Sequence, residues 1–255
     1  MTLIDTHSHI YLPEFDTDRV PMQERAGKEG IRKILMPAID SSTHGMMLKL
    51  EEDDPGTCLS MMGLHPCSVK ENPDAELKIA RDHFGKRSFI AVGETGLDFY
   101  WDKTFAEQQY IAFHQQIEWA LHYDIPVVIH SRNSVDECIK VAEEHQNGKL
   151  KGVFHCFSGN MDQAGKIIDL GFYMGIGGVL TFKNSGLDVV MEKLNLDNVV
   201  LETDAPYLAP APFRVKRNEP AYLKYVLEKL AKIKNVSKEE IASITTANAE
   251  KLFAV

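Results

Sequence analysis

The sequence predicts an α/β fold, a TIM-type (β/α)8 barrel of eight parallel strands covered by helices, and three observations support it. Eight short apolar runs alternate with segments of helical spacing. The chain has 255 residues, 44% of them hydrophobic, a length at which α/β barrels often form one domain. Possible metal ligands stand at the ends of several runs, and a barrel gathers the C-terminal ends of its strands at one rim. We therefore expect a single domain over residues 1–255 with a metal site at that rim.

The eight apolar runs are rich in Val, Ile, Leu and Phe. Near-continuous apolar strands separated by helices are typical of a parallel sheet that is covered on both faces. We expect strands near residues 2–7, 32–37, 57–63, 88–93, 125–130, 151–155, 171–176 and 198–203.

The segments between the strands have helical spacing. It is clearest over residues 105–123, where apolar side chains recur at three- and four-residue steps, namely Tyr110, Phe113, Ile117 and Leu121. After the last strand, a proline-rich loop over residues 205–220 leads into two helical segments that we expect to close the barrel. No low-complexity tract or Gly/Ser linker divides the chain.

An open doubly wound sheet would show the same alternation of strands and helices. The distribution of ligand candidates separates the two folds. The candidates follow strands one, four, five, six and eight, and in an open sheet the outer strands of this set would not reach one site. Closure of a barrel places strand eight beside strand one, so the candidates favour the barrel.

Charge, hydropathy and cysteine content limit the possible functions. The formal net charge of −9 argues against a long basic track for duplex DNA. Residues 1–12 have no basic n-region or apolar h-region, and no later run approaches the roughly 18 apolar residues of a membrane span. We expect a cytoplasmic monomer that does not contact membranes. The cysteines form no C-x-x-C pair and are expected to be buried reduced thiols: Cys58, Cys67, Cys138 and Cys156.

The first ligand candidates are His7 and His9. They are two residues apart, so on a strand both imidazoles point to the same face and can hold one cation. Alone, the pair is a weak signal, since two hydrogen-bonded polar residues at a barrel mouth would look the same. Asp5 shares their face and is expected to accept a hydrogen bond from an imidazole.

Three further candidates follow strands in the middle of the chain. Glu94 closes the run FIAVGE, where a buried carboxylate is costly unless it is paired or bound to metal, and its two oxygens can bridge two cations. His130 ends PVVIH and His155 ends KGVFH, which implies a second cation rather than one crowded site. Each also has an ordinary alternative, a rim ion pair for Glu94 and a hydrogen-bonded core position for each histidine.

The last candidate ends the eighth strand. Glu202 and Asp204 share a face of NVVLETD, so the pattern alone leaves either carboxylate as the inward one. We choose Asp204 because it stands nearer the C-terminal end, where barrel active sites lie. A first site would then consist of His7, His9, Glu94 and Asp204, and a second of Glu94, His130 and His155.

Six motifs follow one another nearly from end to end of the chain: DTHSH, GLHP, GETGLDFYWD, PVVIHSR, FHCFSG and LETDAPYLAP. In this order they resemble the signatures of the TatD-type metal-dependent deoxyribonucleases, a branch of the amidohydrolase-like barrels. The resemblance implies hydrolysis of DNA phosphodiesters with divalent metal, in several members from the 3′ end of single strands. It places the metal ligands at His7, His9, Glu94, His130, His155 and Asp204.

The chain departs from the family pattern at a few positions. The H-x-H pair is followed by Ile10 and Tyr11, where family members usually have Leu and Asp. Beyond LETDAPYLAP, Phe213 stands where His is common, and Val215 where Gly is common. These positions lie outside the ligand set, so we expect them to affect substrate contacts more than metal binding.

The expected chemistry is an in-line displacement at phosphorus. Two divalent ions of zinc, manganese, nickel or magnesium, roughly 3.5 to 4 Å apart and bridged by Glu94 and a hydroxide, would lower the pKa of the water and clamp the reacting oxygens. Asp204 would orient the nucleophile and accept its proton. The two ions outweigh the two carboxylates, so the pocket would attract phosphate in an acidic protein.

Contacts to the DNA substrate are expected from His65, Arg132 and Tyr207. His65 and Arg132 stand at the rim and suit phosphate oxygens, although an ordinary rim ion pair would also explain Arg132. Tyr207, Tyr100 and Trp101 lie just beyond strand ends, where they would stack an unpaired base or pack between loop and helix.

Two other functions stay open. The first is hydrolysis of an amide or ester, including the deacylation of aminoacyl-tRNA. Many such enzymes bridge their metals with a carboxylated lysine, and GETG offers no lysine there, which argues for the nuclease. The second is a metal-binding scaffold without turnover, against which stands a complete ligand set with open coordination.

Overall fold

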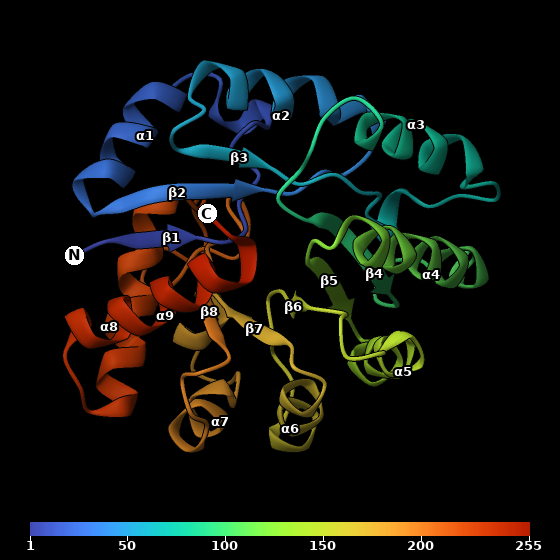
Figure 1. Cartoon of the computed structure of the whole chain (residues 1–255). Coiled ribbons are helices and arrows are strands. Elements are labelled where there is room, and N and C mark those ends of the chain that lie inside the picture. The colour runs from blue at the N-terminus through green and yellow to red at the C-terminus, as the bar shows by residue number, and fades with distance from the viewer.

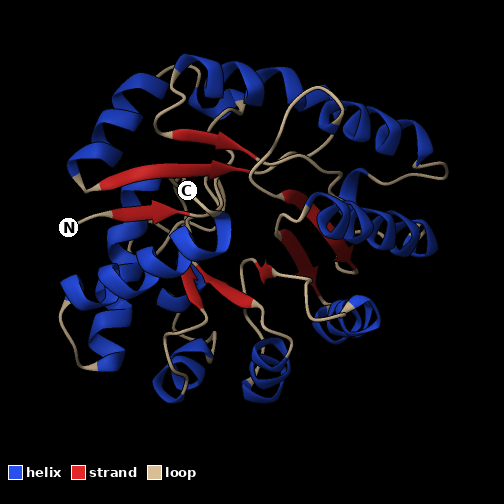
Figure 2. Cartoon of the chain, viewed as in Figure 1, coloured by secondary structure: helices blue, strands red, loops and turns tan.

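The computed structural model describes all 255 residues and confirms the barrel, with a ring of parallel strands at the centre and the helices around it (Figures 1 and 2). The strands are β1 (Leu3–Asp5), β2 (Ile31–Met36), β3 (Cys58–Ser60), β4 (Val92–Asp98), β5 (Val127–Arg132), β6 (Gly152–Phe154), β7 (Tyr173–Ile176) and β8 (Val199–Leu201). Strand and helix alternate in the order that the sequence predicts.

The helices follow the strands and end in an additional pair. They are α1 (Arg19–Lys28), α2 (Ser41–Asp53), α3 (Asp74–Phe84), α4 (Ala106–Tyr123), α5 (Val135–His145), α6 (Met161–Asp169), α7 (Leu187–Lys193), α8 (Leu223–Lys234) and α9 (Lys238–Phe253). Four short 3-10 helices lie in loops, at Pro13–Phe15, Pro66–Ser68, Gly178–Thr181 and Pro220–Tyr222. The predicted helix over residues 105–123 is α4, and the closing pair is α8 and α9. No helix combines the length and the apolar composition that crossing a bilayer requires.

Backbone hydrogen bonds close the ring between its last and first strands. The strands pair as β1-β2-β3 and as β4-β5-β6-β7-β8, all parallel. At one seam the Asp204 N–H donates to the His7 carbonyl at 2.8 Å, and the His9 N–H donates to the Ala205 carbonyl at 2.7 Å. This seam brings the first and last ligand candidates together, although nearly 200 residues separate them.

The second seam joins β3 to β4. Met62, just after β3, forms a parallel bridge with Val92, and the Gly93 N–H donates to the Met62 carbonyl at 2.9 Å. The ladder with β5 then continues to Asp98, opposite Arg132, so Glu94 lies inside β4 rather than at its end. The expected strand boundaries at residues 93 and 130 were wrong because the polar residues that follow still pair through their backbones.

The interior of the barrel is a single apolar layer. Each strand, or the residue next to it, contributes one buried side chain, namely Ile4, Leu35, Met61, Ala91, Val128, Val153, Tyr173 and Val200. The end of α9 packs Leu252 and Phe253 against this layer. The Asn248 amide donates to the Val199 carbonyl at the start of β8, so α9 covers the N-terminal end of the barrel and leaves the C-terminal rim open.

One histidine outside the predicted site is buried without partners, and two of the four cysteines differ from expectation. His44, on α2, is buried under α3 with no hydrogen-bond partner for either ring nitrogen, and its ring lies 5.1 Å from that of His83. Cys58 and Cys138 are buried as predicted. Cys67 is exposed, and the half-buried Cys156 lines the pocket at the rim, because both follow strand ends where apolar packing stops.

An ionic network fixes the long loop that follows β8. Asp18, just before α1, accepts hydrogen bonds from Arg217 and from Arg25, each at 2.7 Å, and Arg25 also binds Glu219 at 2.7 Å. The Asn218 amide donates to the carbonyl of Tyr207 at 2.7 Å. These contacts tie both ends of the loop to the barrel, so the residues after Asp204 have a defined position over the rim.

Replacing Asp18 with Asn should lower the Tm at neutral pH by about 2 to 4 °C, because two guanidinium groups lose their shared carboxylate. Hydrogen bonds from Arg217 and Arg25 hold the pKa of Asp18 below its ordinary value of 3.8. Because this folded-state pKa is depressed, the stabilisation is present above pH 3.8 and decreases as the pH falls below it. Thermal unfolding of both proteins at neutral pH and near pH 3 measures this difference.

Asp53→Asn is the matched control, because the exposed Asp53 carboxylate binds only Lys49, four residues earlier on α2. It should shift the Tm by less than about 1 °C. Equal Tm values for wild type and Asp18→Asn at neutral pH would show that the network does not stabilise the fold.

Candidate metal centre

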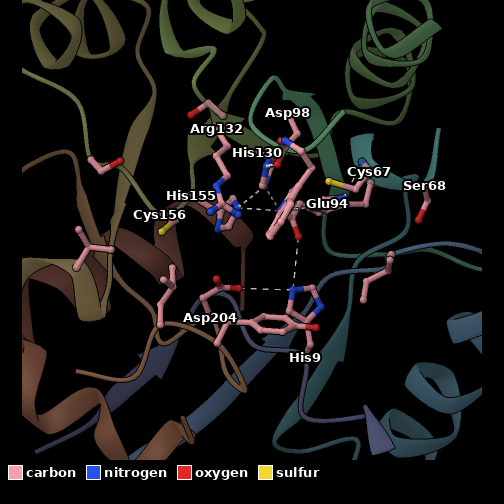
Figure 3. A pocket seen from close by; sticks show the side chains of 18 of the residues that line it. His9, Cys67, Ser68, Glu94, Asp98, His130, Arg132, His155, Cys156 and Asp204 are labelled. Carbon is pink, nitrogen blue, oxygen red and sulfur yellow. Dashed lines mark hydrogen bonds and ion pairs between the residues drawn. The ribbon is translucent and has the colours of Figure 1, made fainter. Parts of the chain in front are cut away.

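A cavity of about 770 Å³ opens at the C-terminal ends of the strands (Figure 3). Nine residues were predicted for the site, and eight of them line this cavity: His9, His65, Glu94, His130, Arg132, His155, Asp204 and Tyr207. The ninth, His7, is completely buried directly behind the wall. The topology of the barrel therefore brings all the predicted residues to one place.

The first group of ligand atoms surrounds one oxygen of Glu94. The Nε2 atoms of His7 and His9 lie 3.2 and 3.5 Å from Glu94 Oε2. The same two nitrogens lie 3.7 and 3.6 Å from Asp204 Oδ1. Two imidazole nitrogens from the segment after β1, one carboxylate oxygen from β4 and one from the segment after β8 thus face a common point.

The second group surrounds the other oxygen of the same carboxylate. Glu94 Oε1 lies 2.7 Å from His155 Nε2, 2.8 Å from His130 Nδ1 and 3.4 Å from His65 Nε2. The rings of His155 and His7 stack with centroids 3.8 Å apart, so the two groups are in direct contact. His65, which was predicted to bind substrate, lies inside this second group at the mouth of the cavity.

The donor set fits divalent metal ions. Ligands at about 2.0 to 2.2 Å from a four-coordinate ion are separated from one another by roughly 3.3 to 3.6 Å. The separations in the first group, 3.2 to 3.7 Å, agree with this range, whereas His155 and His130 in the second group lie closer to Glu94, at 2.7 and 2.8 Å. Imidazole and carboxylate together suit zinc and other first-row divalent ions.

The charge balance of the site depends on Glu94, whose exposed fraction is only 2%. Burial opposes its charge, but the neighbouring His155 and His65 outweigh burial and hold its pKa well below the usual value. Burial and the neighbouring His155 lower the pKa of His7 well below 6.5, which keeps its ring neutral as a ligand must be. Burial raises the pKa of Asp204 to about 6.

Glu202 and Asp204 were equal candidates in the sequence, and the structure separates them. Asp204 has left the strand with a φ of 57°, so the alternation of β8 no longer applies to it, and its carboxylate faces the cavity. Glu202 is buried behind His155, where it accepts the Cys156 N–H and lies 3.6 Å from His155 Nδ1. A side chain at Gly175 would collide with this carboxylate, which explains the glycine.

The hydroxyl of Tyr11 orients His9. It donates to the Pro37 carbonyl at 2.7 Å and therefore accepts the Nδ1–H of His9 at 3.0 Å. His9 thus presents the lone pair of Nε2 to Glu94 and Asp204. The departure of Tyr11 from the family's Asp places a neutral phenol in a position where a carboxylate would perform the same orientation.

Asp98 orients His130 and was not predicted as a site residue. Its Oδ2 accepts the Nε2–H of His130 at 2.9 Å, which leaves Nδ1 to face Glu94. Although burial opposes its charge, hydrogen bonds from His130, Tyr100 and Trp101 hold the pKa of Asp98 below the ordinary value. Asp98 follows Glu94 by four residues on β4, so period-two alternation, applied beyond residue 93, would have found it. Asp5 was expected in such a role but instead accepts hydrogen bonds from Thr203.

Replacing Tyr11 with Phe should weaken zinc binding about 10- to 100-fold, because His9 loses the acceptor that fixes its tautomer and ring orientation. Competition titration against a chromogenic chelator measures the affinity directly, independently of any activity. Tyr225→Phe is the control, since the Tyr225 hydroxyl has no hydrogen bond and lies on α8 away from the cavity. Unchanged zinc affinity in Tyr11→Phe would mean that the phenol does not support the ligand.

Comparisons with known proteins identify the family of the chain. The family described as TatD related DNase matches residues 4–254. The uncharacterized metal-dependent hydrolase YabD of Bacillus subtilis is 36% identical over 256 residues and covers 99% of both chains. The 3′-5′ ssDNA/RNA exonuclease TatD of Rahnella is 31% identical over 249 residues, which cover 95% of this chain and 94% of that protein.

A solved structure gives the same result. The Escherichia coli TatD homologue YjjV superimposes with a TM-score of 0.93 at 32% identity, covering 99% of this chain and 98% of that one. Both the expected barrel and the expected family are confirmed. The chain belongs to the TatD family of metal-dependent hydrolases.

Proposed function

We propose that this protein is a deoxyribonuclease that removes nucleotides from the 3′ end of single-stranded DNA. The observation that carries the proposal is the division of donor atoms between the two oxygens of Glu94, since two-ion sites of this kind serve phosphodiester hydrolysis. The printed function of the Rahnella relative supports the choice of single-stranded substrate.

The residues that would hold the two divalent ions follow from the two groups. His7, His9 and Asp204 would bind one ion together with Glu94 Oε2, and His130 and His155 would bind the other with Glu94 Oε1. When bound, such ions supply positive charge that polarises a phosphodiester and lowers the pKa of water. We propose zinc, manganese, nickel or magnesium as the native metal.

Asp204 is the residue that would accept the proton of the attacking water. Its carboxylate faces the cavity, and burial raises its pKa to about 6, close to the pH at which a base has to act. The backbone of Asp204 is held in place, because its N–H donates to the His7 carbonyl across the seam of the barrel. The base and the first group of ligands therefore keep one geometry.

The substrate would be held at the open side of the site. His65 lines the cavity beside the second group and can donate to a phosphate oxygen. The Arg132 guanidinium contacts the rings of Tyr100 and Trp101 and forms no ion pair with a carboxylate of the chain, so its donors are available for a phosphate. Tyr207 lies across the cavity with its ring 6.1 Å from that of His9, where it would contact a sugar or a base.

Replacing Asp204 with Asn should lower kcat on end-labelled single-stranded DNA at least 100-fold, because the variant cannot accept the proton. Asp197→Asn is the matched control, an exposed carboxylate at the opposite end of β8 that should leave kcat within about twofold. Gel assays of the 3′-labelled and 5′-labelled strands measure the rate and the polarity. Chelation should abolish the activity, and added Mn²⁺ or Zn²⁺ should restore it.

The same protein assayed against a panel of amides, esters and aminoacyl-tRNA separates the competing function. Cleavage of amides or esters without any cleavage of DNA would refute the proposal. So would DNA cleavage that persists after the bound metal has been removed and shown to be absent.

A further inference from the structure

An exposed cluster of two aromatic rings and one guanidinium borders the second group of ligands. The Arg132 guanidinium lies 3.9 Å from the ring centre of Tyr100 and 5.1 Å from that of Trp101. The two rings meet edge to face with centroids 4.8 Å apart. Trp101 is 69% exposed and Tyr100 is 53% exposed, so neither is a packing residue between loop and helix.

This cluster is fixed in place rather than loose on the surface. The Asp98 carboxylate accepts the N–H groups of Tyr100 and Trp101 at 3.0 and 3.2 Å through Oδ1, and it binds His130 through Oδ2. One buried carboxylate therefore sets the position of the backbone at Tyr100 and Trp101 relative to His130. The position of a ring bound there and the position of the reacting phosphate are coupled through Asp98.

The cluster also faces the cavity in which the reaction would occur. Trp101 and Arg132 line it together with Glu94 and His130, and Figure 3 shows Arg132 over the side of the cavity that carries His130 and His155. An exposed indole has an unfavourable free energy in water unless a flat apolar surface covers it. The N–H donors of the Arg132 guanidinium beside it form no hydrogen bond within the chain. A flat ring could therefore pack on the indole while an anion binds the guanidinium next to it.

We propose that Trp101, supported by Tyr100 and Arg132, is a stacking site for one unpaired nucleobase next to the phosphate to be cut. This inference rests on the proposed nuclease function and specifies what that function recognises. Arg132 then binds the phosphate attached to the stacked nucleotide. A base in a duplex is paired and stacked on its neighbours, so it reaches the indole only when the strand end is open.

The site would accept any of the four bases. Stacking uses the π-face that every base has, and neither the indole face nor a guanidinium bound to phosphate reads the hydrogen-bonding edge of a base. We therefore expect a strong preference for single strands over blunt duplex ends and little preference for sequence.

The test compares Trp101→Ala, Trp101→Phe and wild type on a single-stranded oligonucleotide. Trp101→Ala should raise KM about 5- to 150-fold, the range expected from the loss of one base–aromatic stack. Trp101→Phe keeps a ring and should recover most of the loss. Tyr123→Ala is the control, because it removes a part-exposed aromatic on α4 outside the cavity and should leave KM unchanged. Metal content and Tm are measured for every variant to show that each one is folded and loaded.

A second set of substrates locates the stacked base. Each oligonucleotide of this set lacks one base near the 3′ end. For one of them, the KM of the wild type should rise by the same factor as it does for Trp101→Ala on the intact strand. The KM of Trp101→Ala should be the same on that oligonucleotide as on the intact strand, since the variant already lacks the stacking contact.

The outcomes distinguish the two proposals. If the wild type cuts no DNA, the nuclease proposal is wrong. If the wild type cuts DNA and Trp101→Ala has the same KM, the nuclease proposal stands and the stacking site is refuted. The stacking site would also be refuted if every abasic oligonucleotide raised the KM of the wild type and of Trp101→Ala by the same factor.

Discussion

The site is organised by one buried carboxylate among five imidazoles. Glu94 has almost no contact with solvent, and each of its oxygens faces a different set of ring nitrogens, from His7 and His9 on one side and from His65, His130 and His155 on the other. A buried charge of this kind is tolerated only with partners on every side. Strands from both ends of the chain must meet to provide them, so closure of the barrel is a condition for the site.

The orientation of the proposed ligands depends on a second set of residues, each of which contacts one histidine. Tyr11 fixes His9 with a hydroxyl, Asp98 fixes His130 with a carboxylate, and Glu202 lies behind His155. The neutral phenol at position 11 adds no charge to a site that already holds Glu94, Asp98 and Asp204. Asp98 has a further consequence, because it also holds the loop that carries Trp101 and so links the proposed metal site to the proposed stacking site.

Much of this arrangement could be predicted from the sequence, for physical reasons that also explain the errors. All eight strands were predicted, because a parallel strand that is buried on both faces consists almost entirely of apolar residues and so forms a recognisable run. Where a strand ends in polar residues, the apolar pattern stops before the strand does. The predicted boundary of β4 therefore fell before Asp98, and the role of that residue was missed. The burial of a polar side chain without hydrogen-bond partners, as at His44, cannot be read from the spacing of residues in the sequence. The choice between Glu202 and Asp204 depended on a backbone angle that no pattern of side chains reveals.

The most direct test is to locate the metal by anomalous diffraction from crystals of the protein reconstituted with zinc. The account predicts two ions in each chain, roughly 3.5 to 4 Å apart, with one oxygen of Glu94 bound to each. A single ion held by one group of histidines, or ions bound without Glu94, would contradict it.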